Sequence, residues 1–148
     1  MIKKISYWII LILAASLVFG FLLEVVNRGT ASASSIYDEF YPVIEQINRS
    51  VPIVTEPGVR LDGASIDPSI GITYRYTLTG LDGGQVENPQ GTRQTMREYS
   101  IRESCGHPDI APALRAGVTF IHTYRDSKGR RFTSITVDQN ACRRAGIM

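Results

Sequence analysis

Cysteine, histidine and tryptophan are scarce in this sequence, whose 148 residues contain two, two and one of them. Metal sites in proteins are built mostly from cysteine and histidine side chains at close spacing, and neither type is clustered here. The two cysteines, Cys105 and Cys142, also lack the C-x-x-C spacing of a redox pair. We therefore expect no metal ion and no cofactor.

The sequence also has no excess of positive charge that would favour a polyanionic partner. Its formal net charge is +2. Three basic residues and one acidic residue precede Gly29, which leaves thirteen basic and thirteen acidic residues in the rest of the chain. Nucleic-acid binding favours a basic stripe with interleaved aromatic residues. No such stripe is present, so we exclude nucleic acid as a partner.

One apolar run is long. Ile5–Leu23 contains nineteen residues without a charge and follows Lys3 and Lys4. A helix of that length spans about 28 Å, close to the hydrocarbon thickness of a bilayer. The two lysines favour a cytoplasmic amino end and export of the rest. We expect residues 1–28 to be a single-pass anchor in a bacterial inner membrane, with the C-terminal domain in the periplasm.

A cleaved signal peptide is the alternative for this segment. Ala31-Ser32-Ala33 has the small-residue form of a cleavage site, and cleavage there would release a secreted or periplasmic soluble factor. No cysteine follows the apolar run directly, so we do not expect a lipid anchor. Ser16 and Gly20 form a small-x-x-x-small pair through which two anchor helices could associate as a weak homodimer.

The remainder is long enough for one domain with a proper core. Residues 29–35 are small and polar and are expected to form a flexible tether. Residues 36–148 are expected to form a periplasmic α+β domain, with a mainly antiparallel sheet of about four strands and two or three helices. The expected elements are a helix over 36–51, strands over 59–66 and 72–78, helices over 92–104 and 108–116, and strands over 118–125 and 131–137.

The sequence leaves two features of these elements undecided: the effect of Pro42 on the first helix, and the face of the last two strands that meets the helices. Pro42 cannot donate its backbone hydrogen bond, so the first helix either kinks there or begins there. In the last pair of strands, a regular hairpin loop places two sets of side chains on opposite faces. One set is Phe120, His122, Tyr124, Phe132, Ser134 and Thr136, and the other is Ile121, Ile135 and Val137. Both faces are partly apolar, so the pattern does not decide which one meets the helices.

The two cysteines point to a disulfide, because an even number of cysteines in an exported domain normally pairs. A bond between Cys105 and Cys142 would stabilise the domain by about 4 kcal/mol in the chain-entropy account. The alternative is a small thiol or hydrolytic enzyme that uses Cys105 with His107 as its base, which would require an unpaired thiol. We find no other catalytic constellation and expect a protein that is not an enzyme.

Tyrosine is the side chain that most favours a binding surface here, because it is enriched at protein interfaces. The alternative is that the tyrosines complete a small core while their hydroxyls stay in contact with water. The longest irregular stretch, Gly80–Gly91, is expected to be mobile and to contribute to the same surface. The candidate interaction residues are Tyr74, Tyr76, Tyr99, Tyr124, Gly83 and Gly84.

The segment from Cys105 to Cys142 carries a recurrent order of features. A cysteine precedes a short helix, and Gly117-Val118-Thr119, an aromatic strand, Tyr124-x-Asp-x-x-Gly129 and a final cysteine follow. In this order the chain resembles a type of small exported bacterial envelope protein and, more weakly, the pilotin domains that help secretin outer-membrane channels. The resemblance implies an envelope location and a disulfide, and it carries no active site. We expect a non-enzymatic accessory or protein-binding module whose partner is another envelope protein.

Overall fold

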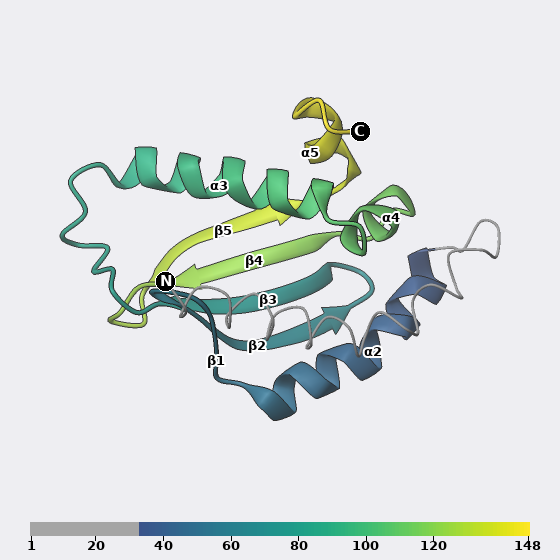
Figure 1. Ribbon diagram of the computed structural model, residues 1–148, viewed down its shortest axis with the longest axis horizontal. Coiled ribbons are helices and arrows are strands. Elements are labelled where there is room, and N and C mark those ends of the chain that lie inside the picture. Colours follow the sequence, from purple (N-terminus) through teal and green to yellow (C-terminus); the bar gives the residue numbers. More distant parts are fainter. Residues whose placement is uncertain (1–32) are drawn as a thin grey trace, which may run out of the picture. The chain divides into compact units, whose positions relative to one another are not determined.

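Residues 33–148 are described by the computed structural model, and the predicted membrane anchor lies outside this part of the chain. The elements in chain order are α2 (Ala33–Ser50), β1 (Ile53–Glu56), β2 (Val59–Asp67), β3 (Gly71–Leu78), α3 (Pro89–Gly106), α4 (Ile110–Arg115), β4 (Phe120–Arg125), β5 (Arg131–Val137) and α5 (Gln139–Arg144) (Figure 1). None of the helices within residues 33–148 is both long and apolar enough to cross a bilayer.

The five strands form one mixed sheet in the order of the sequence, β1-β2-β3-β4-β5. Neighbouring strands are antiparallel except β3 and β4, which run parallel. The α+β class is confirmed, and most of the strand pairings are antiparallel as expected. The sheet differs from the expectation in having five strands rather than about four, and in being mixed, because one pair of neighbours is parallel. A parallel pair requires a long connection, and α3 with α4 provides it. The missed strand, β1, has only four residues and lies between Pro52 and Pro57, too short to show a clear alternation.

Helix α2 begins at Ala33 and continues through Pro42 to Ser50, so it does not begin at the proline. Pro42 is exposed, and the helix turns its apolar side to β2 and the sheet beyond it. Phe40 meets Phe120 of β4 edge to face, with ring centroids 5.8 Å apart. Near its end, Asn48 exchanges two hydrogen bonds with the backbone of Ala64 in β2, at 2.9 and 2.8 Å. These contacts fix the helix along one edge of the sheet.

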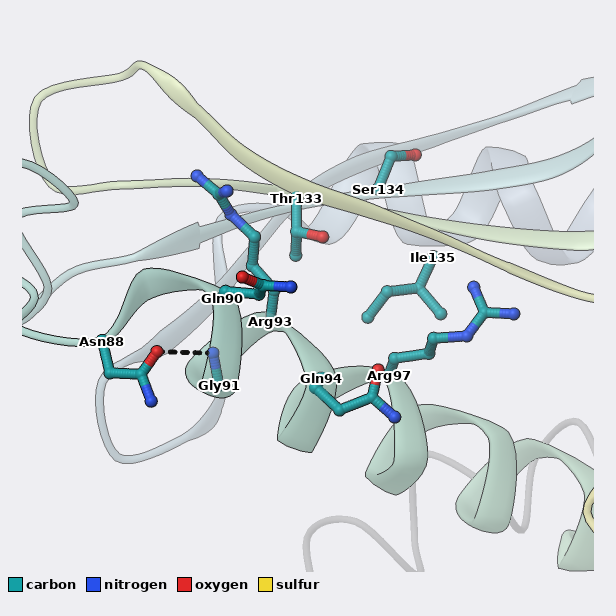
Figure 2. A pocket seen from close by; sticks show the side chains of 9 residues that line it. All are labelled: Asn88, Gln90, Gly91, Arg93, Gln94, Arg97, Thr133, Ser134 and Ile135. Carbon is teal, nitrogen blue, oxygen red and sulfur yellow. Dashed lines mark hydrogen bonds between the residues drawn. The ribbon is translucent and has the colours of Figure 1, made fainter.

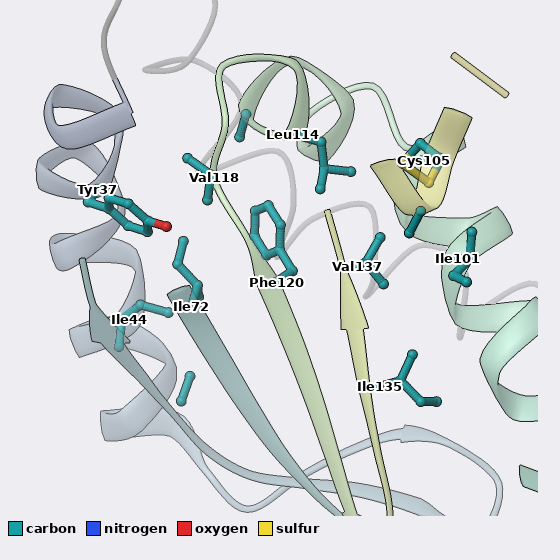
Figure 3. Packing of buried hydrophobic residues seen from close by; sticks show 14 residues of the cluster. Tyr37, Ile44, Ile72, Ile101, Cys105, Leu114, Val118, Phe120, Ile135 and Val137 are labelled. Atoms are coloured by element: carbon teal, nitrogen blue, oxygen red, sulfur yellow. A yellow bond between two sulfur atoms is a disulfide. The ribbon is translucent and has the colours of Figure 1, made fainter. Parts of the chain in front are cut away.

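Helices α2 and α3 pack on the same face of the sheet, near its opposite edges. Figure 3 shows Ile44 of α2 directed toward Ile72 on one side, and Ile101 of α3 near Val137 on the other. The completely buried core residues are Ile72, Leu114, Val118, Phe120, Val137 and Cys142. The central strands β3 and β4 therefore contribute buried side chains to the core, and they lie beneath the space between the two helices.

The pairing of β4 with β5 differs by one residue from the expected register. Phe120 pairs with Val137, and His122 pairs with Ile135. The pairing shifts between Tyr124 and Arg125, and a shift of one residue moves every later side chain to the other face. The predicted grouping of faces is thus wrong: Ile135 and Val137 share the helix-covered face with Phe120 and His122.

The predicted disulfide between Cys105 and Cys142 is confirmed. Its two Cα atoms are 5.6 Å apart, and both residues are buried. The bond joins the last turn of α3 to α5, a short helix that the sequence pattern had not indicated. Asp138 begins α5 by accepting a hydrogen bond from the Ala141 amide at 2.6 Å, as an N-cap does.

The loop between β3 and α3 is tied to the β4–β5 turn by one buried carboxylate, Asp126, which is 2 % exposed. Asp126 accepts hydrogen bonds from the Gly83 amide at 3.2 Å and from the Arg130 side chain at 2.9 Å. Burial by itself would raise the pKa of Asp126, but these hydrogen bonds outweigh it and hold the pKa below its usual value. Arg130 also bonds Asp82. The first half of the loop is thereby held against the turn between β4 and β5.

Candidate functional site

The helix-covered face of β3 and β4 carries a layer of stacked aromatic rings. The strand register places Tyr74 beside His122 and Tyr76 beside Tyr124. Ring centroids are 5.8 Å apart for Tyr74 and His122, 6.0 Å for Tyr76 and His122, and 5.0 Å for Tyr76 and Tyr124. Side chains on neighbouring parallel strands meet in this way because aligned residues project from the same face. Three residues predicted as surface tyrosines thus belong to one aromatic layer.

This layer forms the floor of a groove of about 480 Å³, here called the aromatic groove. Tyr76, His122 and Tyr124 line the floor, while Met96 and Tyr99 of α3 line one wall. The groove runs toward β1 and the start of β2 on its other side. Most of its lining is apolar, although it lies open at the surface of the domain.

Two carboxylates stand at the rim of the aromatic groove. Glu56 belongs to β1 and Glu103 to α3, and both are exposed. The Tyr99 hydroxyl, on a side chain 48 % exposed, donates a hydrogen bond to Glu56 at 3.2 Å. This bond links the helix to the edge strand across one end of the groove.

The floor of the groove is uncharged at neutral pH. Burial lowers the pKa of His122 to about 4, so its imidazole is neutral, and it contacts the Ser104 hydroxyl at 3.4 Å. Burial raises the pKa of Tyr74 to about 12. Burial, followed by the nearby Tyr124 hydroxyl, raises the pKa of Tyr76 still further. Negative charge is therefore confined to the rim carboxylates.

The structure brings some of the predicted interaction residues together and leaves others apart. Tyr76, Tyr99 and Tyr124 line the aromatic groove, and Tyr74 supports its floor from within the same stack. Gly83 and Gly84 lie in the loop held by Asp126 and do not line the groove.

Met96, Glu56 and Glu103 belong to the groove but were not identified from the sequence. Glu56 lies on the strand that was missed. Met96 and Glu103 lie on a helix whose apolar side is too weak to mark which residues face the sheet.

The thiol-enzyme alternative is wrong, because the Cys105 sulfur is bonded to Cys142 and no free cysteine occurs in residues 33–148. His107 is half exposed and its Nδ1 accepts a hydrogen bond from the Asp109 amide at 3.2 Å, which is a turn contact. Within the same residues no three His, Cys, Asp or Glu side chains cluster as metal ligands would.

A second cleft, of about 630 Å³, lies on the other side of α3; it is lined mostly by residues with polar side chains and is here called the polar cleft (Figure 2). Its lining residues come from the N-cap and first half of α3 and from β5: Asn88, Gln90, Gly91, Arg93, Gln94, Arg97, Thr133, Ser134 and Ile135. Asn88 caps α3 by accepting a hydrogen bond from the Gly91 amide at 2.9 Å. No carboxylate lines this cleft, whereas two arginines do.

Comparison with known proteins identifies similar folds but no family. No protein-family model matches the sequence, and no curated protein matches it. Among solved structures, the chain is similar to EpsS, the pilotin of the type 2 secretion system of Vibrio vulnificus, at 13% identity and a TM-score of 0.59 over 74% of this chain and 94% of that one. It is also similar to AspS, the type II secretion system pilotin of Vibrio cholerae, at 14% identity and a TM-score of 0.57 over 74% and 94%.

A third similar structure is a candidate secreted protein of Pseudomonas aeruginosa, at 10% identity and a TM-score of 0.57 over 74% of this chain and 92% of that one. Identities this low establish a shared fold and nothing finer. The domain in residues 33–148 has the fold found in these two pilotins and in this third protein.

Proposed function

We propose that this chain is a non-enzymatic accessory protein of a bacterial envelope, anchored in the inner membrane by a helix over Ile5–Leu23. Its folded domain lies in the periplasm and binds a segment of another envelope protein in the aromatic groove. The observation that carries this proposal is the groove itself, which has a mostly apolar lining, a half-exposed tyrosine, Tyr99, on its wall, and carboxylates only at its rim.

The chemistry of the groove defines the kind of segment that would fit. Tyrosine rings supply a large contact area at a low entropy cost, and they are enriched among the residues that dominate binding energies. Met96 adds a flexible, adaptable surface beside them. Glu56 and Glu103 favour a positive charge at the edge of an apolar segment. The partner segment is therefore apolar where it meets the floor and carries lysine or arginine beside that part.

The fold and the disulfide support the envelope part of the proposal. EpsS and AspS are pilotins of secretion systems, and this domain shares their fold. Disulfides persist in oxidising compartments such as the periplasm, and the bond between Cys105 and Cys142 fits that location. A membrane-anchored periplasmic accessory protein is consistent with both observations.

Fractionation tests the location. The full-length chain is expected in the inner-membrane fraction, to resist extraction by alkaline carbonate, and to have a domain that added protease reaches only after the outer membrane is opened. A mature chain that begins near Ser34 and is recovered in the soluble fraction would instead support the secreted alternative.

Photocrosslinking in cells tests the binding surface. A photoreactive phenylalanine in place of Tyr99 is expected to capture one envelope protein, through a segment that is apolar and basic. The matched control is the same substitution at Tyr41, a tyrosine of α2 that is 45 % exposed and lies outside the groove. Capture of the same proteins from both positions, or of a polar or acidic segment from Tyr99, would contradict the proposal.

A further inference from the structure

From the outer edge of β5 and the arginines beside it, we infer a second binding surface. An extended, acidic peptide segment adds to the sheet there as a sixth strand, and its carboxylate lies in the polar cleft beside Arg97. This surface is formed by a different side of α3 from the one that lines the aromatic groove, so it does not depend on the function proposed for the groove.

The direction of the backbone groups in β4 is fixed by one hydrogen bond. The Ile72 amide donates to the Thr119 carbonyl at 2.9 Å, so Thr119 turns its backbone groups toward β3. Alternate residues of a strand turn these groups to the same side. The intervening residues, Phe120, His122 and Tyr124, therefore turn theirs toward β5.

The same alternation sets the outer edge of β5. The residues of β5 opposite Phe120, His122 and Tyr124 use their backbone groups within the sheet. Ser134 and Thr136 therefore turn their backbone N–H and C=O groups away from the sheet. Phe132 does the same, and its carbonyl accepts a hydrogen bond from Arg93 Nε at 2.9 Å. Within residues 33–148 no backbone or side-chain group bonds the outward N–H and C=O of Ser134. This is the donor and acceptor pair that an added strand would use.

The cleft beside this edge selects for negative charge. Arg97 is exposed and forms no ion pair with any carboxylate of the described domain, and Figure 2 shows it beside Ile135. Arg93 lies over the Phe132 ring, 5.1 Å from its centroid, and adds a second positive charge. Guanidinium groups bind carboxylates well because their donors match the carboxylate geometry.

Charge also decides between a partner peptide and a second copy of this chain. Pairing two β5 edges would bring the arginines of both copies into one space, where they repel each other. An acidic segment would neutralise them. The other edge strand, β1, is less suited to strand addition because it has four residues and its pairing with β2 is irregular.

Peptide binding to the detergent-solubilised full-length chain tests this inference. The probe is a fluorescein-labelled peptide of sequence Thr-Val-Thr-Glu-Thr-Val-Thr, measured by fluorescence anisotropy. One comparison peptide carries lysine in place of glutamate, and another keeps glutamate but has its alternate amides methylated, so that it cannot pair with a strand. We expect saturable binding of the first peptide, and affinities lower by about tenfold for the other two.

Variants of the protein separate the two parts of the surface. Arg97→Glu is expected to weaken binding of the glutamate peptide by about tenfold and to strengthen binding of the lysine peptide. Arg102→Glu, at an exposed arginine of α3 outside the cleft, is expected to change neither. Ser134→Pro removes the outward N–H at a position where an edge strand tolerates proline, and it is expected to abolish binding. If that variant fails to fold, the methylated peptide answers the same question without changing the protein.

Several results would overturn the inference. These are the absence of saturable binding, equal affinities for the glutamate and lysine peptides, equal effects of Arg97→Glu and Arg102→Glu, and full affinity in a folded Ser134→Pro variant. Sedimentation provides a further test. A dimer that Ser134→Pro dissociates and that the glutamate peptide does not compete with would assign this edge to a second copy.

Discussion

At the scale of single residues, His122 is held neutral by its place in the aromatic stack. Burial lowers its pKa from 6.5 to about 4. Between these two pH values the unfolded chain binds a proton that the folded chain does not, so stability decreases as the pH falls from 6.5 toward 4. We expect the neutral His122 to lower the free energy of unfolding by about 2 kcal/mol when the pH is lowered from 7.5 to 5.

Urea unfolding at the two pH values measures this effect. His122→Phe keeps a ring in the stack and removes the titrating group, so the difference between wild type and variant isolates the histidine from the carboxylates. The loss between pH 7.5 and pH 5 should be smaller in the variant by about 2 kcal/mol. An identical pH dependence in both proteins would show that His122 is not shielded from water as the structure indicates.

Gly71 is a second residue for which the structure predicts the effect of a substitution on stability. It begins β3 with a φ of +139°, and a Cβ atom there would lie 2.5 Å from the Thr119 carbonyl oxygen. Gly71→Ala is expected to lower the unfolding free energy by about 1–3 kcal/mol through backbone strain alone, and by more through the clash. Gly80→Ala, where a Cβ atom meets nothing within 4 Å, is the control and is expected to stay within about 0.5 kcal/mol of wild type.

The urea unfolding midpoints of the two variants test this prediction. Equal midpoints for Gly71→Ala and Gly80→Ala would mean that β3 and β4 do not approach each other as closely as described.

At the scale of secondary-structure elements, the disulfide joins α3 to α5 over 37 residues of sequence. The Cys105→Ala/Cys142→Ala protein is expected to lose about 4 kcal/mol of unfolding free energy, because its unfolded chain regains the freedom of that loop. Denaturant unfolding of the double variant and the wild type measures the difference. A loss below about 1 kcal/mol would mean that packing of α5 on the core makes the bond energetically redundant.

Much of the element order could be predicted from the sequence, because the relevant signals are local. Alternation gave the strand over 72–78, helical spacing gave the first helix, and an even cysteine count gave the disulfide. Strand β1 could not be predicted, since four residues between two prolines carry too little pattern. The parallel pairing and the register of β5 depend on how distant segments meet, and the shift after Tyr124 has no clear mark in the sequence.

The candidate site was predictable only in part, for the same reason. The tyrosines stood out by composition, but their gathering around one groove follows from the pairing of β3 with β4. Glu56 comes from the missed strand, and Arg97 is one of several exposed arginines until β5 is placed beside it. Both surfaces are products of packing between elements far apart in the chain.

At the scale of the whole molecule, α3 separates two surfaces of different chemistry. One side of the helix lines the aromatic groove with its acidic rim, and the other lines the polar cleft at the outer edge of β5. The groove favours an apolar and basic segment, whereas the cleft favours an extended and acidic one. Under the two proposals made above, α3 is therefore shared between two binding surfaces for partner segments.

The most direct measurement of the central claim is the affinity of the segment crosslinked from Tyr99, prepared as a labelled peptide. Glu56→Lys/Glu103→Lys reverses both rim charges, and Glu45→Lys/Glu87→Lys makes the same change in net charge at exposed residues outside the groove. We expect the rim variant to bind the peptide at least about tenfold more weakly than wild type, and the control to bind it unchanged. Equal affinities of the two variants for this peptide would contradict binding in the aromatic groove.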